Sequence, residues 1–383
     1  MRKILRSLSR FLHEADILLF LLCLICAIYG LILISSVARN TITHGSEIYV
    51  QIGAIILGIA LFVLFSYIDI DIIADKSVFL LVFSALFLST LYFWGYGTED
   101  TGNRAWLRFL GIGIQPAEIV KITFIIIIAR MLSNHKERKT LNSIMPLLQI
   151  VLVFALLFGL IVVISADLGT ALVYVFILVV ILFVGGIKLR WFALGIAVVA
   201  GISPLVWTNF LTEKQKNRIL APLFPDLVDP TKLDGVMWQA RQSVKAIRGG
   251  GFLGQGLGKG VMTQSAAIPG QRTDFIFSAA GEELGFVGCL LIVLLLIAII
   301  IRCIYVGIKS NNTLGLLVCS GVAAMLIAQT FENIGMCLGI LPVVGITLPF
   351  YSYGGSSIVT CFAAMGIVSG VKMRPKPARF RIL

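Results

Sequence analysis

The chain has 383 residues, of which 58% are hydrophobic and 13% are charged, and its formal net charge is +12. A soluble protein of this length carries about twice that share of charged residues, so the composition excludes a soluble globular fold. Apolar runs of about 17 or more residues recur along the whole chain, and each is long enough to cross a bilayer as a helix. The sequence therefore predicts an all-α polytopic membrane protein with a single integral membrane domain.

The first apolar run follows the basic start MRKILRSLSRFLHEAD. This run has the length of a full span and no small-residue cleavage site follows it, so we expect no cleavable signal peptide. We expect ten spans, at about 15–36, 49–66, 77–94, 115–132, 143–164, 170–187, 191–210, 275–306, 313–340 and 350–371. An even number of spans places both termini on the same side of the membrane.

Basic residues indicate which side this is. They concentrate at the N-terminus, in the loops after spans 4 and 6, and in the tail: Arg2, Lys3, Arg6, Arg10, Arg130, Lys136, Arg138, Lys139, Lys188, Arg190, Lys372, Arg374, Lys376, Arg379 and Arg381. By the positive-inside rule both termini are cytoplasmic. The positive net charge reflects this bias and attraction to anionic lipid, and it does not indicate a nucleic-acid partner.

Residues 211–274 form one long loop, which this topology places outside the cell. Its stretch VMWQARQSVKAIRGGG predicts a helix that ends at the glycines. Arg241, Lys245 and Arg248 recur at i, i+4 and i+7 and share a face, as in an interfacial amphipathic helix with a cationic side. A solvated basic face is the alternative. The following GGGFLGQGLGKG has no strand before it, so it does not indicate a dinucleotide site.

Several charged residues fall at the outer ends of spans. Glu118 and Lys121, in IQPAEIVK, are spaced to pair on one helix face, and a purely structural ion pair is the alternative. Asp167, in ISADLGTALV, occupies the outer turn between two spans, where capping the next helix would also explain it. Arg104, in GNRAWLRF, lies on the same outer side. These residues are candidates for one cluster with Asp274.

Asp274 is the second residue of the stretch TDFIFSAAGEELGFVG. On a helical wheel Ser278, Gly281 and Gly285 share its face, and such small residues permit either tight helix packing or a cavity. A carboxylate that opens onto a cavity at the membrane surface is a candidate general base, whereas the alternative is a helix N-cap. Glu282 and Glu283 lie deeper, and we interpret them as structural.

The stretches TDFIFSAAGEELGFVG and NIGMCLGILPVVGITLPFYSYGGSS resemble signatures of the SEDS family of proteins for shape, elongation, division and sporulation. QPAEIVK, DLGTAL and QARQSVKAIRGGGFLGQGLG are similar too. The matches run in the family's order from about residue 103 to 357. The chain departs from the family at Pro269, Gly270, Gln271 and Arg272, where Pro-Glu-x-His is usual, which changes the charge beside Asp274.

The resemblance implies a peptidoglycan glycosyltransferase of the bacterial cytoplasmic membrane that polymerises lipid II beside a class B penicillin-binding protein. It implies that Asp274 is catalytic and that Arg104, Glu118, Lys121 and Asp167 belong to the site. For this substrate, Asp274 is expected to deprotonate a sugar hydroxyl in one inverting displacement. The diphosphate of lipid II is expected to be held by the cations Arg104, Arg241 and Lys245. A divalent cation, magnesium or manganese, is a further candidate for holding the diphosphate.

Short tails favour the elongation (RodA-like) branch, and the division (FtsW-like) and sporulation branches stay open. Two other classes of function are a lipid-linked precursor flippase and a non-catalytic scaffold. The sequence shows no clear inverted repeat, which argues against a transporter. Polymerisation by purified protein in detergent would separate these classes, because detergent offers no bilayer across which to flip a lipid.

Overall fold

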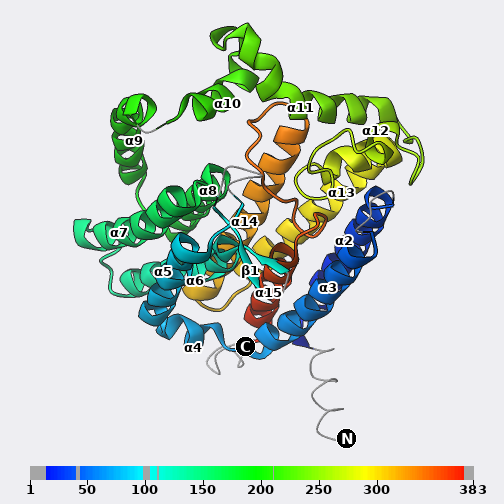
Figure 1. Ribbon diagram of the computed structural model, residues 1–383. Helices are drawn as coiled ribbons and strands as arrows, with labels where there is room; N and C mark the ends of the chain where they lie inside the picture. Colours follow the sequence, from blue (N-terminus) through cyan, green and yellow to red (C-terminus); the bar gives the residue numbers. More distant parts are fainter. Residues whose placement is uncertain (1–13, 40–43, 98–103, 110–111, 210, 375–383) are drawn as a thin grey trace, which may run out of the picture.

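The computed structural model describes residues 14–39, 44–97, 104–109, 112–209 and 211–374. The basic residues Arg2, Lys3, Arg6, Arg10, Lys376, Arg379 and Arg381, on which part of the topology prediction rests, lie outside the described residues. The described chain is a bundle of long helices with one short hairpin (Figure 1).

Within the described ranges, nine helices are long and apolar enough to cross a membrane. They are α2 (Ile17–Val37), α3 (His44–Tyr67), α5 (Ser77–Trp94), α7 (Ile144–Leu160) with its π-helical extension η1 (Ile161–Ser165), α8 (Leu168–Gly185), α9 (Leu189–Asn209), α13 (Ile276–Ile308), α14 (Thr313–Cys337) and α15 (Gly355–Lys372). The chain is thus a multi-pass membrane protein. The span expected at 115–132 is α6 (Pro116–Glu137), which carries Glu118, Lys121 and Arg130. The count of ten therefore stays a prediction.

Close helix contacts in the bundle depend on small residues. A Cβ atom on Gly366 of α15 would lie 2.6 Å from the Phe62 carbonyl oxygen of α3, and one on Gly370 would lie 2.9 Å from that of Phe65. Without side chains at these positions the two backbones approach closely, which is how helices associate in lipid.

One end of the bundle is held by ion pairs. Asp16, before α2, pairs with Arg302 of α13 at 2.7 Å and with Lys372 of α15 at 3.6 Å. Arg374 pairs with Asp69 at 2.5 Å, beside the short helix α4 (Ile70–Asp75). This end therefore gathers the start of α2 and the ends of α13 and α15.

The region after α9 folds over the opposite end. It contains α10 (Glu213–Leu223), the 3-10 turn η2 (Pro225–Leu227), α11 (Pro230–Gly250) and α12 (Val261–Gln264). Figure 1 shows α10, α11 and α12 together across the top, far from α4, whereas α9 stands apart from the other long helices. In agreement, α9 has no buried residue. The described strands form one hairpin of β1 (Leu107–Phe109) and β2 (Ile112–Ile114), which precedes α6.

Candidate functional site

The segment that carries Asp274 is held by hydrogen bonds to three successive backbone carbonyls. The Tyr353 amide donates to the carbonyl of Arg272 at 2.8 Å, and the Ser352 hydroxyl donates to that of Thr273 at 2.5 Å. The Asn333 side-chain amide donates to the carbonyl of Asp274 at 2.7 Å. Asp274 therefore stands on a rigid backbone.

Asp274 lies outside helix α13, which begins at Ile276. The residue at the N-cap position is Phe275, and it makes no side-chain capping bond. The alternative interpretation, that Asp274 caps this helix, is therefore wrong. The helical wheel placed Asp274 in a regular helix, whereas residues 270–275 form a turn in which the Phe275 amide donates to the Gly270 carbonyl at 3.0 Å.

The partners of this segment come from a non-helical stretch between α14 and α15. Residues 340–354 are irregular, and residues 346–352 within them are buried. Irregular backbone at membrane depth requires internal partners. Asn333 donates to the Ile346 carbonyl at 2.6 Å, and the Ser352 hydroxyl accepts from the Leu348 amide at 2.8 Å. The motif NIGMCLGILPVVGITLPFYSYGGSS thus builds the support for Asp274.

The carboxyl group of Asp274 is suited to accept a proton near neutral pH. Burial raises its pKa to about 6, a hydrogen bond with Thr273 opposes the shift, and repulsion by Asp167 adds to it. A general base works best when its pKa lies near the working pH. A Cβ atom on Gly345 would lie 3.4 Å from Oδ2 of Asp274, so the backbone approaches the carboxylate closely at this glycine.

Asp167 is a buried helix cap close to this site. Its Oδ1 accepts from the Thr170 amide at 3.0 Å, and its Oδ2 accepts from the Thr170 hydroxyl at 2.8 Å and from Gln115 Nε2 at 3.0 Å. Burial raises the pKa of Asp167 despite the bonds from Thr170. Asp167 therefore caps α8, as the alternative interpretation held, and its charge also contributes to the raised pKa of Asp274.

Residues 344–346 contact both the start of α8 and Asp274. A Cβ atom on Gly169, two residues after Asp167, would lie 2.8 Å from the side chain of Val344 and 3.1 Å from that of Ile346. Gly345, between these residues, faces Asp274. The start of α8, which Asp167 caps, and the carboxylate of Asp274 therefore both approach the same stretch of backbone, residues 344–346.

Glu118 and Lys121 form the predicted ion pair. Their side chains lie 2.6 Å apart and both are buried at the start of α6. Each interacts electrostatically with Asp167. We call Glu118, Lys121 and Asp167 the charged cluster, and Asp167 in turn acts electrostatically on Asp274.

Arg104 reaches this cluster only through its backbone. Its amide donates to the Ser165 carbonyl at 3.0 Å, next to the turn of Asp167. Its side chain is exposed, and Nη1 donates to the Tyr92 carbonyl at 3.2 Å. The guanidinium therefore remains accessible to a ligand at the surface.

The small-residue face of α13 is filled by α11. The Ser278 and Ser243 hydroxyls lie 2.5 Å apart, and Ser243 also donates to the Cys337 carbonyl at 2.5 Å. A Cβ atom on Gly281 would lie 2.9 Å from the side chain of Ile247. Of the two alternatives for this face, tight packing is therefore right and a cavity is wrong.

Glu282 and Glu283 serve as structural acceptors. Glu282 accepts from the amides of Met262 and Thr263, both at 2.8 Å, and so holds the short helix α12. Glu283 accepts from the Ser36 hydroxyl at 2.5 Å and from Gln264 Nε2 at 2.8 Å. These contacts support the structural interpretation of both residues.

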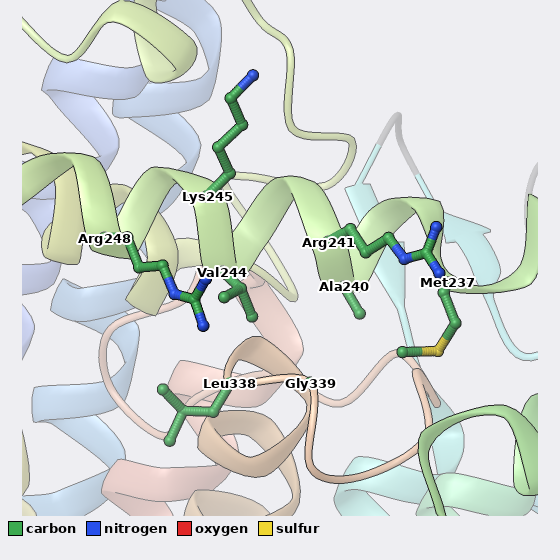
Figure 2. A pocket seen from close by; sticks show the side chains of 8 residues that line it. All are labelled: Met237, Ala240, Arg241, Val244, Lys245, Arg248, Leu338 and Gly339. Carbon is green, nitrogen blue, oxygen red and sulfur yellow. The ribbon is translucent and has the colours of Figure 1, made fainter. Parts of the chain in front are cut away.

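Arg241 and Lys245 line a separate pocket of about 410 Å³ between α11 and the end of α14. Its full lining is Met237, Ala240, Arg241, Val244, Lys245, Arg248, Leu338 and Gly339. Arg241 forms an exposed ion pair with Asp234. Figure 2 shows the side chain of Lys245 pointing away from Leu338 and Gly339. Asp274 is not among the lining residues, although Cys337, adjacent to Leu338, contacts the Asp274 carbonyl at 3.6 Å.

The structure adds polar residues that the sequence analysis did not select. Gln115 and Asn333 position Asp167 and Asp274, and they stand inside the motifs QPAEIVK and NIGM. Gln329, one turn before Asn333 on α14, is buried, and among the described residues its side-chain atoms have no hydrogen-bond partner. A buried amide or carboxylate inside a span was the signal that could have identified Gln329 and its neighbour Glu332.

The described residues contain no group of three His, Cys, Asp or Glu side chains that could hold a metal ion. Within these ranges the side chains therefore do not form a metal site of their own. A divalent cation would need most of its oxygen ligands from a bound diphosphate.

Arg272 lies two residues before Asp274, at a position where the family pattern has histidine. It adds a positive charge there. Its guanidinium is half-buried and forms an ion pair with Glu47 of α3. This pairing directs the added positive charge away from Asp274 and ties the segment to α3.

Comparison with known proteins gives a consistent result. Among similar sequences, peptidoglycan glycosyltransferase MrdB of Escherichia coli (strain K12) is 30% identical over 363 residues, covering 95% of this chain and 94% of that protein. A probable peptidoglycan glycosyltransferase FtsW of Bacillus subtilis (strain 168) is also 30% identical, covering 93% and 90%.

Two solved structures have similar folds. One belongs to a study of structural coordination of polymerization and crosslinking by a peptidoglycan synthase complex, with a TM-score of 0.79, 28% identity, and coverage of 94% of this chain and 98% of that chain. The other is the crystal structure of the rod shape determining protein RodA of Thermus thermophilus, with a TM-score of 0.68, 26% identity, and coverage of 94% and 97%. The family profile of FtsW, RodA and SpoVE cell cycle proteins matches residues 16–376. The resemblance in the motifs is thereby confirmed, and the chain belongs to the FtsW/RodA/SpoVE family.

Proposed function

We propose that Asp274 is the general base with which this protein extends glycan strands from lipid II. The chain is a peptidoglycan glycosyltransferase, the activity that the names of its relatives state. The observation that carries the assignment of Asp274 is its carboxyl group, which is held on a backbone locked at three carbonyls and has a pKa raised to about 6.

The chemistry of the donor explains what the site must supply. In lipid II the anomeric carbon bears a polyprenyl diphosphate, which departs readily once its negative charge is neutralised. Cations therefore take the place of an acid that would protonate the leaving group. Arg104, Arg241 and Lys245 are the exposed cations that we assign to this task.

The acceptor is a sugar hydroxyl, which needs a base. Asp274 removes the hydroxyl proton while the oxygen forms a bond to the anomeric carbon and the bond from that carbon to the diphosphate oxygen breaks. The proton stays on Asp274 until solvent takes it, and the electron pair leaves with the diphosphate. One displacement of this kind inverts the anomeric centre.

Several roles of neighbouring groups follow from the geometry. Asp167 repels the carboxylate of Asp274 and so keeps it basic, while Gln115 and Thr170 fix Asp167. The ion pair of Glu118 and Lys121 orients this turn from α6 and limits the net negative charge of the cluster.

The setting of the enzyme is part of the same proposal. The site faces outward in the bacterial cytoplasmic membrane, both termini are cytoplasmic, and residues 211–274 are extracytoplasmic. The partner is a class B penicillin-binding protein, supported by the likeness to a chain of a peptidoglycan synthase complex. Cell elongation is the favoured role, supported by the likeness to RodA.

The test is polymerisation of lipid II by purified full-length protein in detergent, with and without its penicillin-binding partner. The wild type should form glycan strands, and Asp274→Asn should lose roughly 100- to 10,000-fold, the usual contribution of a positioned base. Polymerisation without a bilayer also separates this enzyme from a flippase. Full activity of Asp274→Asn would end the assignment of the base, and a titration with magnesium, manganese and EDTA shows whether a divalent cation assists.

A further inference from the structure

The first turns of helix α3 contact both the segment of the proposed base and the stretch that supports it. Glu47 forms the ion pair with Arg272 of that segment. Gln51, one turn further along α3 and on the same face, accepts from the Gly354 amide at 3.3 Å and donates through Nε2 to the Ser352 carbonyl at 3.4 Å. One face of α3 therefore binds two stretches of chain that are distant in the sequence.

These two stretches also bind each other. The Ser352 hydroxyl and the Tyr353 amide donate to the carbonyls of residues 273 and 272. The phenol of Tyr353 interacts electrostatically with both Glu47 and Arg272, so it lies near their ion pair. Side-chain and backbone contacts therefore close a ring around the residues just before the proposed base.

Helix α3 is held in the bundle by contacts other than that of Glu47. A Cβ atom on Gly58 of α3 would lie 2.8 Å from the side chain of Phe362 of α15. A Cβ atom on Gly366 of α15 would lie 2.6 Å from the Phe62 carbonyl oxygen of α3. These close contacts lie several turns beyond Glu47, and such packing fixes helices in lipid. The ion pair therefore ties an irregular segment to a helix that is already fixed.

The ion pair and its neighbour are sheltered from solvent. The side chains of Arg272 and Glu47 are 33% and 15% exposed, and Gln51 is fully buried. A partly buried pair is screened less by salt than an exposed one, and a buried amide that loses its partners costs free energy. Loss of Glu47 would free a guanidinium two residues from the carboxylate of Asp274.

We propose that Glu47, acting through Arg272, is a positioning residue for Asp274, and that Gln51 anchors the residues that support the same segment. Glu47 also keeps the guanidinium of Arg272 away from the carboxylate, so that a neighbouring positive charge does not weaken the base. The inference rests on the proposed function, because it concerns the placement of the base which that function requires.

Steady-state polymerisation of lipid II by purified full-length variants in detergent, measured from pH 5 to 8, tests the inference. Glu47→Gln should lower kcat about tenfold and change KM less than about twofold, because misplacement of a catalytic group by 1 Å costs up to about 100-fold in rate. The pH at which the rate is half its maximum should fall below that of the wild type. The reason is that the freed cation of Arg272 stabilises the Asp274 carboxylate and lowers its pKa.

The double variant Glu47→Gln/Arg272→Gln separates position from charge. It lacks the freed cation, so its half-maximal pH should return to the wild-type value. Its kcat should stay low but no lower than that of Glu47→Gln, because both changes break the same pair. Asp167, before α8, and Cys337, at the end of α14, are titratable groups that act on Asp274 from other elements, and both are unchanged in these variants.

Asp75→Asn is the matched control. It breaks the ion pair of Asp75 with Arg130, which joins α4 to α6 at the end of the bundle far from α11 and α12. This variant should keep the kcat, the KM and the half-maximal pH of the wild type. Arg272→Gln breaks the pair of Glu47 from its other side and should lower kcat as Glu47→Gln does, so the inference stays testable if Glu47→Gln folds poorly.

A wild-type kcat in Glu47→Gln or in Arg272→Gln overturns the inference. So does a rate in Glu47→Gln that falls only in proportion to the folded fraction, with the half-maximal pH unchanged, since a purely structural ion pair would behave in this way. Asp274→Asn separates this result from the proposed function. Full activity of Asp274→Asn ends the base assignment itself, whereas an inactive Asp274→Asn beside a normal Glu47→Gln overturns only the positioning role.

Discussion

At the scale of single residues, Asp274 links the folding of this protein to its proposed chemistry. Its carboxyl group has a pKa of about 6 in the folded protein, above the ordinary 3.8, chiefly because of burial. As a base it must be deprotonated to act. We therefore expect polymerisation by the wild type to fall as the pH drops through about 6. A polymerisation rate that does not fall toward low pH when measured from pH 5 to 8 would contradict the base assignment.

The same pKa predicts how stability depends on pH. A carboxyl whose folded pKa is raised stabilises the fold below its unfolded pKa, and this contribution is lost as the pH rises through the folded value. Between pH 4 and pH 7 the wild type should lose up to about 3 kcal/mol from this group. Asp274→Asn lacks this loss, so its melting temperature at pH 7 should exceed that of the wild type, and the difference should vanish near pH 4. A variant less stable than the wild type at pH 7 would refute this account.

Glu283 offers the opposite case, a carboxylate whose role is structural. It accepts hydrogen bonds from Ser36 and Gln264 and so ties α13 to α2 and α12. Glu283→Gln keeps the size but replaces charge-assisted acceptors, at a cost of about 1–3 kcal/mol. We expect a lower melting temperature and nearly normal turnover per folded molecule. A stable but inactive Glu283→Gln protein would move Glu283 into the catalytic group.

At the scale of elements, the attachment of α11 to α13 depends on the absence of side chains. A Cβ atom on Gly250 would lie 1.9 Å from the Gly281 carbonyl oxygen. Gly250→Ala must therefore separate the two helices, and overpacking of this kind costs about 1–3 kcal/mol. Because Ser243 on α11 also supports the end of α14, we expect both melting temperature and polymerisation to fall.

Gly249→Ala is the matched control for this change. A Cβ atom there would meet only Gln255 Nε2, at 3.3 Å, and Gly249 is exposed. Alanine is a better helix former than glycine, so this variant should keep or slightly raise stability. If both substitutions lowered melting temperature and polymerisation equally, the close contact between α11 and α13 would not be the cause of the loss.

The elements also show which features the sequence could predict. Long apolar runs locate the spans, because every crossing helix needs such a run, and the expected span at 275–306 corresponds to α13. The support of Asp274 could not be predicted, because Ser352 and Thr273 are 79 residues apart and local periodicity carries no information on such contacts. The helical wheel failed for the same stretch, since helix α13 starts after Asp274 and is interrupted at Gly285, where φ is 67°.

At the scale of the whole molecule, the two ends of the bundle differ in chemistry. One end carries the ion pairs of Asp16 with Arg302 and Lys372, and of Arg374 with Asp69. The other end carries Asp274, the charged cluster and the pocket beneath α11. A membrane between them would place substrate chemistry on one side and the structural ion pairs on the other, which is the arrangement that the positive-inside rule predicts from the basic loops.

This orientation can be measured because all seven native cysteines are buried and have free thiols. A single cysteine introduced at an exposed position should then be the only site that reacts with a membrane-impermeant maleimide. Asp226 lies in the 3-10 turn before α11, and Asn311 lies in the turn between α13 and α14, where the neighbouring Asn312 contacts Asp71 at 3.3 Å. Both positions are exposed. We expect Asp226→Cys to be labelled in intact cells and Asn311→Cys only after the membrane is permeabilised. The reverse pattern would place the charged cluster and Asp274 in the cytoplasm, where an outward-facing polymerase could not use them.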